Sequence, residues 1–245
     1  RRSSFKSDLL KPDFLPPCML KDPEFLKCST KTMQALFNAF SKGIPGIVDP
    51  ADPYSLKQLV VQQSGIESAS IQVELNNVIV KGFSHTTVTE SIIDTKTFNM
   101  ITKFRIPHIH ADADYVLNGR ILLLPLQGKG DLFFDIEDLK VIIYTDTHLY
   151  EKGGFTFFNV TKVKAEVDPA IVKSRLNNLF NGNKELEEST NELFNKDWKA
   201  FYEAMKPTII QTFEKLVYQV LHQVCNKVPA NFFITDIPKS TEVYT

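Results

Sequence analysis

The chain has 245 residues, of which 43% are hydrophobic and 23% are charged, a composition typical of a globular protein. Its formal net charge of −1, with both signs mixed along the chain, excludes the basic surface that nucleic acid or an anionic membrane requires. No stretch approaches the roughly 20 apolar residues that span a bilayer, so we expect no stable membrane insertion. Nineteen phenylalanines against one tryptophan indicate a large apolar interior, or a partly hollow one lined by aromatic rings.

The first expected element is a helix over residues 23–42, which follows an N-terminal arm of residues 1–22. Phe37 and Phe40 belong to an apolar set that recurs at helical spacing, and Gly43 provides a stop signal.

Two of the three cysteines, Cys18 and Cys28, lie close together near the start of the chain. A bridge between them would pin the arm to the helix, would contribute roughly 2–3 kcal/mol, and would imply an oxidising compartment. The alternative is three free thiols in a cytosolic protein. Cys225 has apolar neighbours and is expected to be a buried, inert thiol. Asn159 begins a glycosylation sequon, which is consistent with secretion but common by chance.

From residue 56 to residue 168 apolar and polar residues alternate, which predicts strands. Glycine pairs near residues 128–130 and 153–154 are typical of hairpin turns, and no helical pattern intervenes. Sequential strands joined by short turns are antiparallel. Several strands exceed the usual length, so we expect one large, strongly curved antiparallel sheet.

A second long helix is expected over residues 183–228, followed by a tail of residues 229–245. Apolar residues step by three or four across this segment, and its length would be on the order of 60 Å. Pro207 is expected to kink the helix or break it in two. Because the helix is apolar over a wide arc, the sheet should wrap around it. The prediction is a single elongated α+β domain covering residues 1–245.

The search for catalytic chemistry finds no nucleophile elbow, no phosphate-binding glycine loop and no zinc spacing of cysteines. We therefore expect neither an enzyme nor a cofactor, with a hydrolase as a minor alternative. His108, His110, Asp112 and Asp114 alternate along one strand, so all four would share a face that could hold a metal. The alternative is that this face lies in solvent, because the interleaved residues are small or apolar.

Two groups of short motifs extend over nearly the whole chain. The C-terminal group comprises Asn178-Leu179-Phe180-Asn181-Gly182-Asn183-Lys184-Glu185-Leu186, Asn191, Phe194-Asn195, Trp198-Lys199, Pro207, Val228-Pro229 and Phe232-Phe233. The upstream group comprises Pro17-Cys18, Cys28, Lys42-Gly43-Ile44-Pro45, Tyr115, Gly119 and Ile121-Leu122-Leu123-Leu124-Pro125-Leu126-Gln127-Gly128. Together they resemble the insect takeout-like proteins, relatives of the haemolymph juvenile hormone binding proteins.

This resemblance implies a long helix wrapped by a curved sheet, the roll of the tubular lipid-binding type, and a disulfide between Cys18 and Cys28. It also implies a secreted carrier, in haemolymph or a sensory fluid, for a terpenoid, fatty-acyl or quinone-like ligand, with a protein receptor as a further candidate partner. Because Cys225 lacks a partner, the chain is closer to the takeout branch than to the hormone carriers, which usually have a second bridge.

A tunnel lined by apolar side chains is the expected ligand site. The expected lining consists of Phe37, Phe40, Phe98, Met100, Phe104, Tyr115, Leu122, Leu124, Val141, Ile143, Phe158, Trp198, Phe201, Tyr202, Met205, Ile209 and Phe213. Tyr115 and Tyr202 are the expected polar contacts to the ligand, with Thr145 or Thr147 as alternatives. The opposing interpretation is that these side chains fill an ordinary core, in which case the protein would be an interaction or signalling protein of the same fold.

Overall fold

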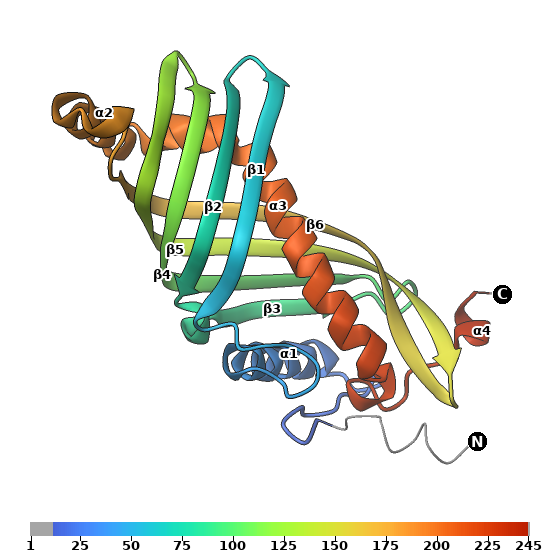
Figure 1. Ribbon diagram of the computed structural model, residues 1–245. Coiled ribbons are helices and arrows are strands. Elements are labelled where there is room, and N and C mark those ends of the chain that lie inside the picture. The colour runs from blue at the N-terminus through green and yellow to red at the C-terminus, as the bar shows by residue number, and fades with distance from the viewer. Residues whose placement is uncertain (1–11, 245) are drawn as a thin grey trace.

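Six antiparallel strands form one sheet in the computed structural model, which describes residues 12–244 (Figure 1). The strands are β1 (Tyr54–Ile66), β2 (Ala69–Lys81), β3 (Thr87–Ile93), β4 (Met100–Ile121), β5 (Leu124–Lys152) and β6 (Phe155–Leu176). Their order across the sheet is β1-β2-β4-β5-β6, and β3 pairs with the first part of β4. The strands expected from the alternation of apolar and polar residues over 56–168 are present, and the last strand, β6, extends to Leu176.

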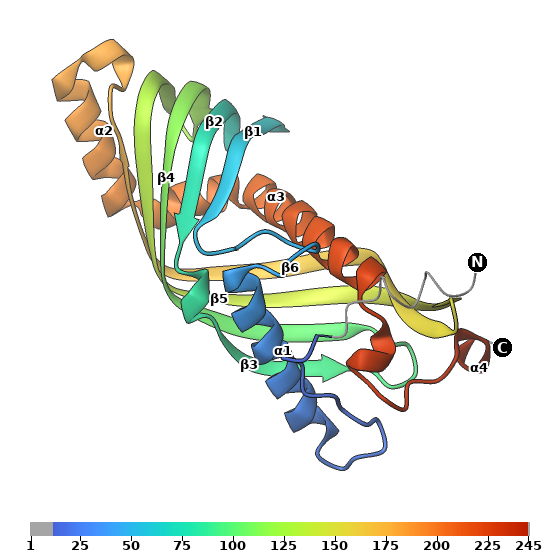
Figure 2. The same cartoon turned by 60° about the horizontal axis from the view of Figure 1, so that its bottom comes forward.

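The long strands β4 and β5 run through both halves of a strongly bent sheet (Figure 2). Along one edge of β4 the partner changes from β3, paired up to Arg105, to β2, paired from His110. Between these positions Pro107, which lacks an N–H, lies opposite Asp138, whose φ is +49°. Neither residue fits a regular pleat, so the ladder is interrupted where the two halves of the sheet meet.

Helix α1 (Phe25–Lys42) lies along the outer edge of β3 and covers it (Figure 2). The Gln34 side chain donates to the Thr86 carbonyl at 3.0 Å and accepts from the Val88 N–H at 2.7 Å. Ser29 donates to the Ser91 carbonyl at 2.8 Å. These contacts satisfy an edge that would otherwise expose unpaired backbone groups.

The expected single helix over residues 183–228 is two helices, α2 (Lys184–Lys196) and α3 (Trp198–Lys227). The interruption lies at Asp197, and α3 continues through Pro207. Asn191 bonds to both the N–H and the carbonyl of Leu176, and Asn195 does the same with Ser174. α2 is thereby fixed along the end of β6, so the chain must turn before it can cross the sheet.

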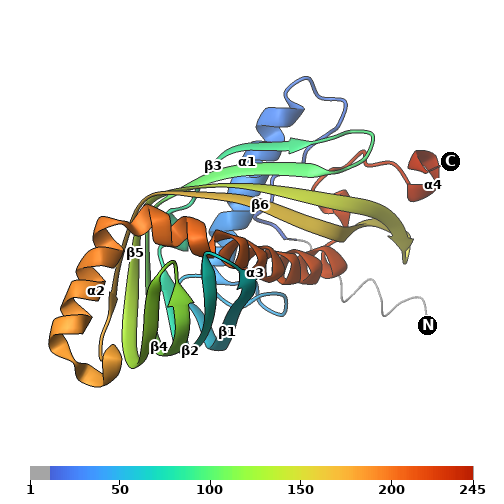
Figure 3. The same cartoon turned by 90° about the horizontal axis from the view of Figure 1, so that it is seen from above.

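Helix α3 then crosses the concave side of the sheet diagonally, while α2 remains beyond its end (Figure 3). After α3 come a short 3-10 turn (Ala230–Phe232) and helix α4 (Ser240–Val243). The segment between them pairs Ile234 with Cys18 of the N-terminal arm. Among the described residues no helix is both long and apolar enough to cross a membrane.

Candidate ligand-binding site

The first free edge of the sheet, strand β1, is attached to α3 through one buried amide. Gln63 is 3% exposed, and its Nε2 donates to the Ala204 carbonyl at 2.8 Å. Its Oε1 accepts from the Thr208 hydroxyl at 2.6 Å. Both ends of the Gln63 side chain are therefore satisfied by the helix.

The opposite free edge, strand β6, is attached to the same helix. The Tyr202 hydroxyl donates to the Val167 carbonyl at 2.5 Å, and Glu214 accepts from the Ala165 N–H at 2.9 Å. Lys164 pairs with Glu214 at 3.1 Å. With both edges bound to α3, the curled sheet and the helix surround a common interior.

Most side chains of α3 are only partly buried. Of the 30 residues in the helix, only Ala204 and Val224 are buried. Apolar residues such as Met205 and Phe213 are half-buried, and Ile209 is 37% exposed. A helix packed closely against a sheet would bury such side chains, because protein interiors reach crystal-like density.

At one end of the interior, the turn between β4 and β5 and the junction of α2 with α3 enclose an open groove of about 780 Å³. We call it the α2–α3 groove. Its apolar walls are formed by Leu122, Leu124, Leu193, Trp198 and Phe201. The tip of the turn, Leu123, also lines it and is 93% exposed.

At the other end lies a small cavity of about 70 Å³, which we call the disulfide-side cavity. It is lined by Cys18, Phe25, Ser29, Thr32, Met33, Leu36, Ile93, Met100, Phe158, Leu221, Val224, Cys225, Phe233 and Ile234. Its two hydroxyls are engaged elsewhere, that of Ser29 with Ser91 and that of Thr32 with the Pro16 carbonyl. The chemistry facing the cavity is therefore apolar.

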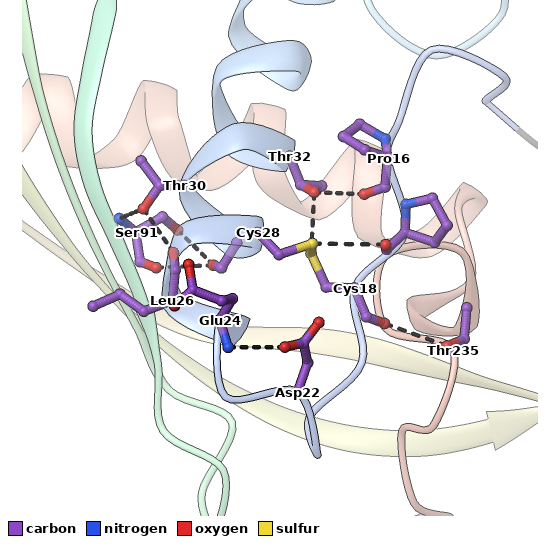
Figure 4. Close-up of a disulfide and its surroundings, with 12 residues drawn as sticks. Pro16, Cys18, Asp22, Glu24, Leu26, Cys28, Thr30, Thr32, Ser91 and Thr235 are labelled. Carbon is purple, nitrogen blue, oxygen red and sulfur yellow. Dashed lines mark hydrogen bonds between the residues drawn. A yellow bond between two sulfur atoms is a disulfide. The ribbon is translucent and has the colours of Figure 1, made fainter.

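The disulfide between Cys18 and Cys28 is present, with an S–S distance of 2.03 Å (Figure 4). It joins the N-terminal arm to the first turns of α1 beside the disulfide-side cavity. Cys225 is the free cysteine of the described chain, and burial raises the pKa of its thiol to about 12. A thiol with that pKa is a poor nucleophile at neutral pH.

The structure distributes the expected lining residues over several environments. Leu122, Leu124, Trp198 and Phe201 line the α2–α3 groove, and Met100 and Phe158 line the disulfide-side cavity. Tyr115, Met205, Phe37, Phe104, Val141, Ile143, Phe213, Phe40 and Phe98 belong to apolar clusters along the interior. Tyr202 lies on a shallow outer groove beside Asp168 and Trp198.

Three of the hydroxyls that were expected to contact a ligand have protein partners in the structure. Tyr115 is 1% exposed and donates to the Asn177 carbonyl at 2.7 Å. Burial raises its pKa to about 12, as it does for Tyr202, which is bonded to β6. Thr147 donates to the Phe98 carbonyl at 2.6 Å. Each of these hydrogen bonds joins segments that are distant in the sequence.

Sequence reasoning also missed residues that line the two hollows. Leu193, Lys196 and Lys199 line the α2–α3 groove, while Met33 and Leu221 line the disulfide-side cavity. For Met33 and Leu221, helical spacing with their apolar neighbours was an available signal. Nothing in the sequence distinguished the two lysines from other exposed lysines.

His108 and His110 of β4 are hydrogen-bonded to a carboxylate on the neighbouring strand, that of Asp135 on β5. His108 Nε2 and His110 Nδ1 both lie 2.8 Å from Asp135 Oδ1, and His110 Nε2 lies 3.1 Å from Asp112. The hydrogen bond to Asp135 is the main reason that the pKa of His110 is raised. Asp114 is separate and bonds to Asn77. Within residues 12–244 no cluster of three or more such side chains is arranged to hold a metal.

Comparison with known proteins identifies relatives over most of the chain. The family model described as haemolymph juvenile hormone binding protein matches residues 3–235. The circadian clock-controlled protein daywake of Drosophila melanogaster is 26% identical over 230 residues, which cover 91% of this chain and 87% of that protein. Daywake of Drosophila yakuba is 25% identical with the same coverage.

A solved structure, that of Takeout 1 from Epiphyas postvittana, has the same fold, with a TM-score of 0.77. It is 24% identical in sequence, and the match covers 89% of this chain and 98% of Takeout 1. The curved antiparallel sheet with a helix on its concave side is thereby confirmed. Because the family model spans nearly the whole chain, the protein belongs to the haemolymph juvenile hormone binding protein family.

Proposed function

We propose that the protein is an extracellular carrier that holds a small elongated hydrophobic ligand between α3 and the concave face of the sheet. The observation that carries the proposal is that α3 is fixed to both edges of the sheet while its apolar side chains stay half-buried. The apolar hollows at the two ends of the interior are the candidate ends of a tunnel. The description of the family, which names a hormone-binding protein of haemolymph, supports the same function.

The energetics favour transfer of a hydrophobic ligand from water into such a space. Burial of a ligand with roughly 300–400 Å² of apolar surface contributes about 8–10 kcal/mol before ordering costs. Walls that are already formed keep those costs small. We propose the same lining as expected from the sequence for the middle of the tunnel, where Phe104, Val141 and Ile143 face Phe213.

An extracellular location is supported by two observations. The Cys18–Cys28 disulfide is of the kind that persists in oxidising compartments. Asn159 is exposed on β6, so its sequon is accessible to the glycosylation machinery. Treatment of protein secreted from insect cells with a glycosidase that removes N-linked glycans would show a mass shift if Asn159 is modified.

The carrier function is tested by Phe213→Asp, with Val116→Asp as a matched control on the outer face of β4. A carboxylate in the interior opposes apolar burial, so we expect at least about tenfold weaker binding of the neutral probe N-phenyl-1-naphthylamine. Val116 is 40% exposed, and the control should bind the probe like wild type. Far-UV circular dichroism verifies that both variants fold.

The second candidate is an interaction protein whose interior is filled by its own side chains. Contacts of Phe213 and Val217 with the buried residues Phe104 and Val141 favour it in the middle of the molecule. Wild-type protein that binds no neutral probe, and that shows no bound lipid by native mass spectrometry after isolation from its source, would support this candidate and refute the carrier.

A further inference from the structure

The α2–α3 groove carries positive charge that an entirely neutral ligand would not use. Lys196, at the end of α2, and Lys199, in the first turn of α3, both line it. Lys199 Nζ lies 5.6 Å from the centroid of the Trp198 ring, which is itself part of the apolar wall. Two ammonium groups therefore border an apolar surface at the proposed tunnel mouth.

Lys196 and Lys199 have no ion pair with any residue of the described chain, whereas two other lysines of the same helices do. Lys184 pairs with Glu187 at 3.0 Å, and Lys206 pairs with Glu203 at 3.2 Å. Asp197 is the one acidic residue that lines the groove, and it leaves an excess of one positive charge there. The excess charge is available to an anion.

The opposite wall is held in place independently of the lysines. Leu122 has a φ of +54°, and its N–H donates to the Ser68 carbonyl at 2.6 Å. Arg120 donates to the carbonyls of Leu122 and Glu67. The apolar turn is thereby fixed across the groove from the two lysines.

We propose that this groove binds the head group of a fatty acid, with its carboxylate at Lys196 and Lys199 and its chain along Leu122, Leu124 and Phe201. The proposal rests on the carrier function proposed above and adds the chemical class of the ligand. A groove of about 780 Å³ lies within the range of small-molecule sites. A neutral ester of the same chain keeps the apolar contacts and loses the charge-assisted contacts to the ammonium groups.

The test compares dodecanoate with methyl dodecanoate by displacement of N-phenyl-1-naphthylamine at pH 7.5, where the acid is ionised. We expect wild type to bind the acid at least about fivefold more tightly than the ester, the scale of two partly exposed ion pairs. The double variant K196Q/K199Q should lose this preference and keep its affinity for the ester. K31Q/K162Q removes two exposed lysines from α1 and β6 and should behave like wild type.

Equal affinity of wild type for acid and ester would overturn the head-group proposal and leave the carrier function intact. A preference for the acid that persists in K196Q/K199Q would have the same consequence. If neither compound displaces the probe because the probe itself does not bind, the carrier function fails with it. Loss of the preference in 500 mM salt would support the proposal, since salt screens exposed charges. Binding to phosphatidylserine vesicles without binding of free dodecanoate would also refute it, because the occupant would then be a membrane surface.

Discussion

The contact most directly responsible for closing the sheet onto α3 is that of Gln63, and its removal should open the β1 edge. Gln63→Leu keeps the size of the side chain but removes the hydrogen bonds to the Ala204 carbonyl and the Thr208 hydroxyl. Each bond contributes about 0.5–1.5 kcal/mol net, so the free energy of unfolding should fall by about 1–3 kcal/mol. The Thr208 hydroxyl can turn to a carbonyl of its own helix, which limits the loss.

The assay for Gln63→Leu combines urea unfolding with hydrogen exchange of the β1 amides. We expect a lower urea midpoint with an unchanged slope, and faster exchange in β1 than in β5. The neighbouring Gln62 is exposed and points away from the helix, so Gln62→Leu should change stability by less than about 0.5 kcal/mol. If Gln63→Leu unfolds at the wild-type midpoint and β1 exchange is unchanged, the edge contact does not close the sheet.

Three further predictions concern the Cys18–Cys28 disulfide, the thiol of Cys225 and the pKa of His110. Replacement of both Cys18 and Cys28 by Ser opens a short loop and should cost about 3 kcal/mol in urea unfolding; chemical reduction of wild type should have the same effect. Cys225, with a pKa of about 12, should resist Ellman's reagent at pH 8 until the protein is unfolded. Because the pKa of His110 is raised in the folded state, its contribution to stability is present below pH 6.5 and is lost as the pH rises through the folded pKa. Asp135→Asn should lower that pKa in an NMR titration and reduce the pH dependence, while Asp112 remains as a second partner of His110.

The fold class could be predicted because each part of it has a local signal. Alternation over residues 56–168 specified strands, and the turn at Gly153-Gly154 specified an antiparallel pair. The turn expected at residues 128–130 is wrong, because these glycines lie within β5 and the chain turns from β4 into β5 at Leu122-Leu123. The direction and degree of curvature have no such signal. The interruption at Pro107 and Asp138 involves residues about thirty positions apart, so it becomes visible only when β4 and β5 are paired.

The break at Asp197 could not be predicted from periodicity. Phe194, Trp198 and Phe201 keep helical spacing across it, and Pro207 was the more obvious candidate. The turn is imposed by tertiary contacts, because Asn191 and Asn195 fix α2 to the end of β6. Such contacts override local preference and leave no trace in the spacing of apolar residues.

The hydrogen-bond partners of the tyrosine hydroxyls in the candidate site could not be predicted either. The type of residue shows that Tyr115 and Tyr202 need a partner when buried, but it does not show whether the partner is a ligand or a carbonyl. Tyr115 is bonded to a residue 62 positions away, and Tyr202 to one 35 positions away. Lys196 and Lys199 are the converse case: both are exposed, and only their position in the groove beside the β4–β5 turn sets them apart from other exposed lysines.

The attachment of α3 by polar contacts at both edges of the sheet would allow the proposed tunnel to persist beneath the helix. A helix held only by apolar packing would settle onto the sheet, because each buried methylene contributes about 0.8 kcal/mol. Gln63 on β1 and the Val167 carbonyl on β6 instead hold the helix at the two edges of the sheet. The curvature of the sheet sets the distance between these edges. Movement of α3 toward the concave face would break these buried hydrogen bonds before new apolar contacts form. In the proposed carrier, the geometry of the edges would therefore set the space for a ligand, and the side chains facing the interior would set the chemistry of that space.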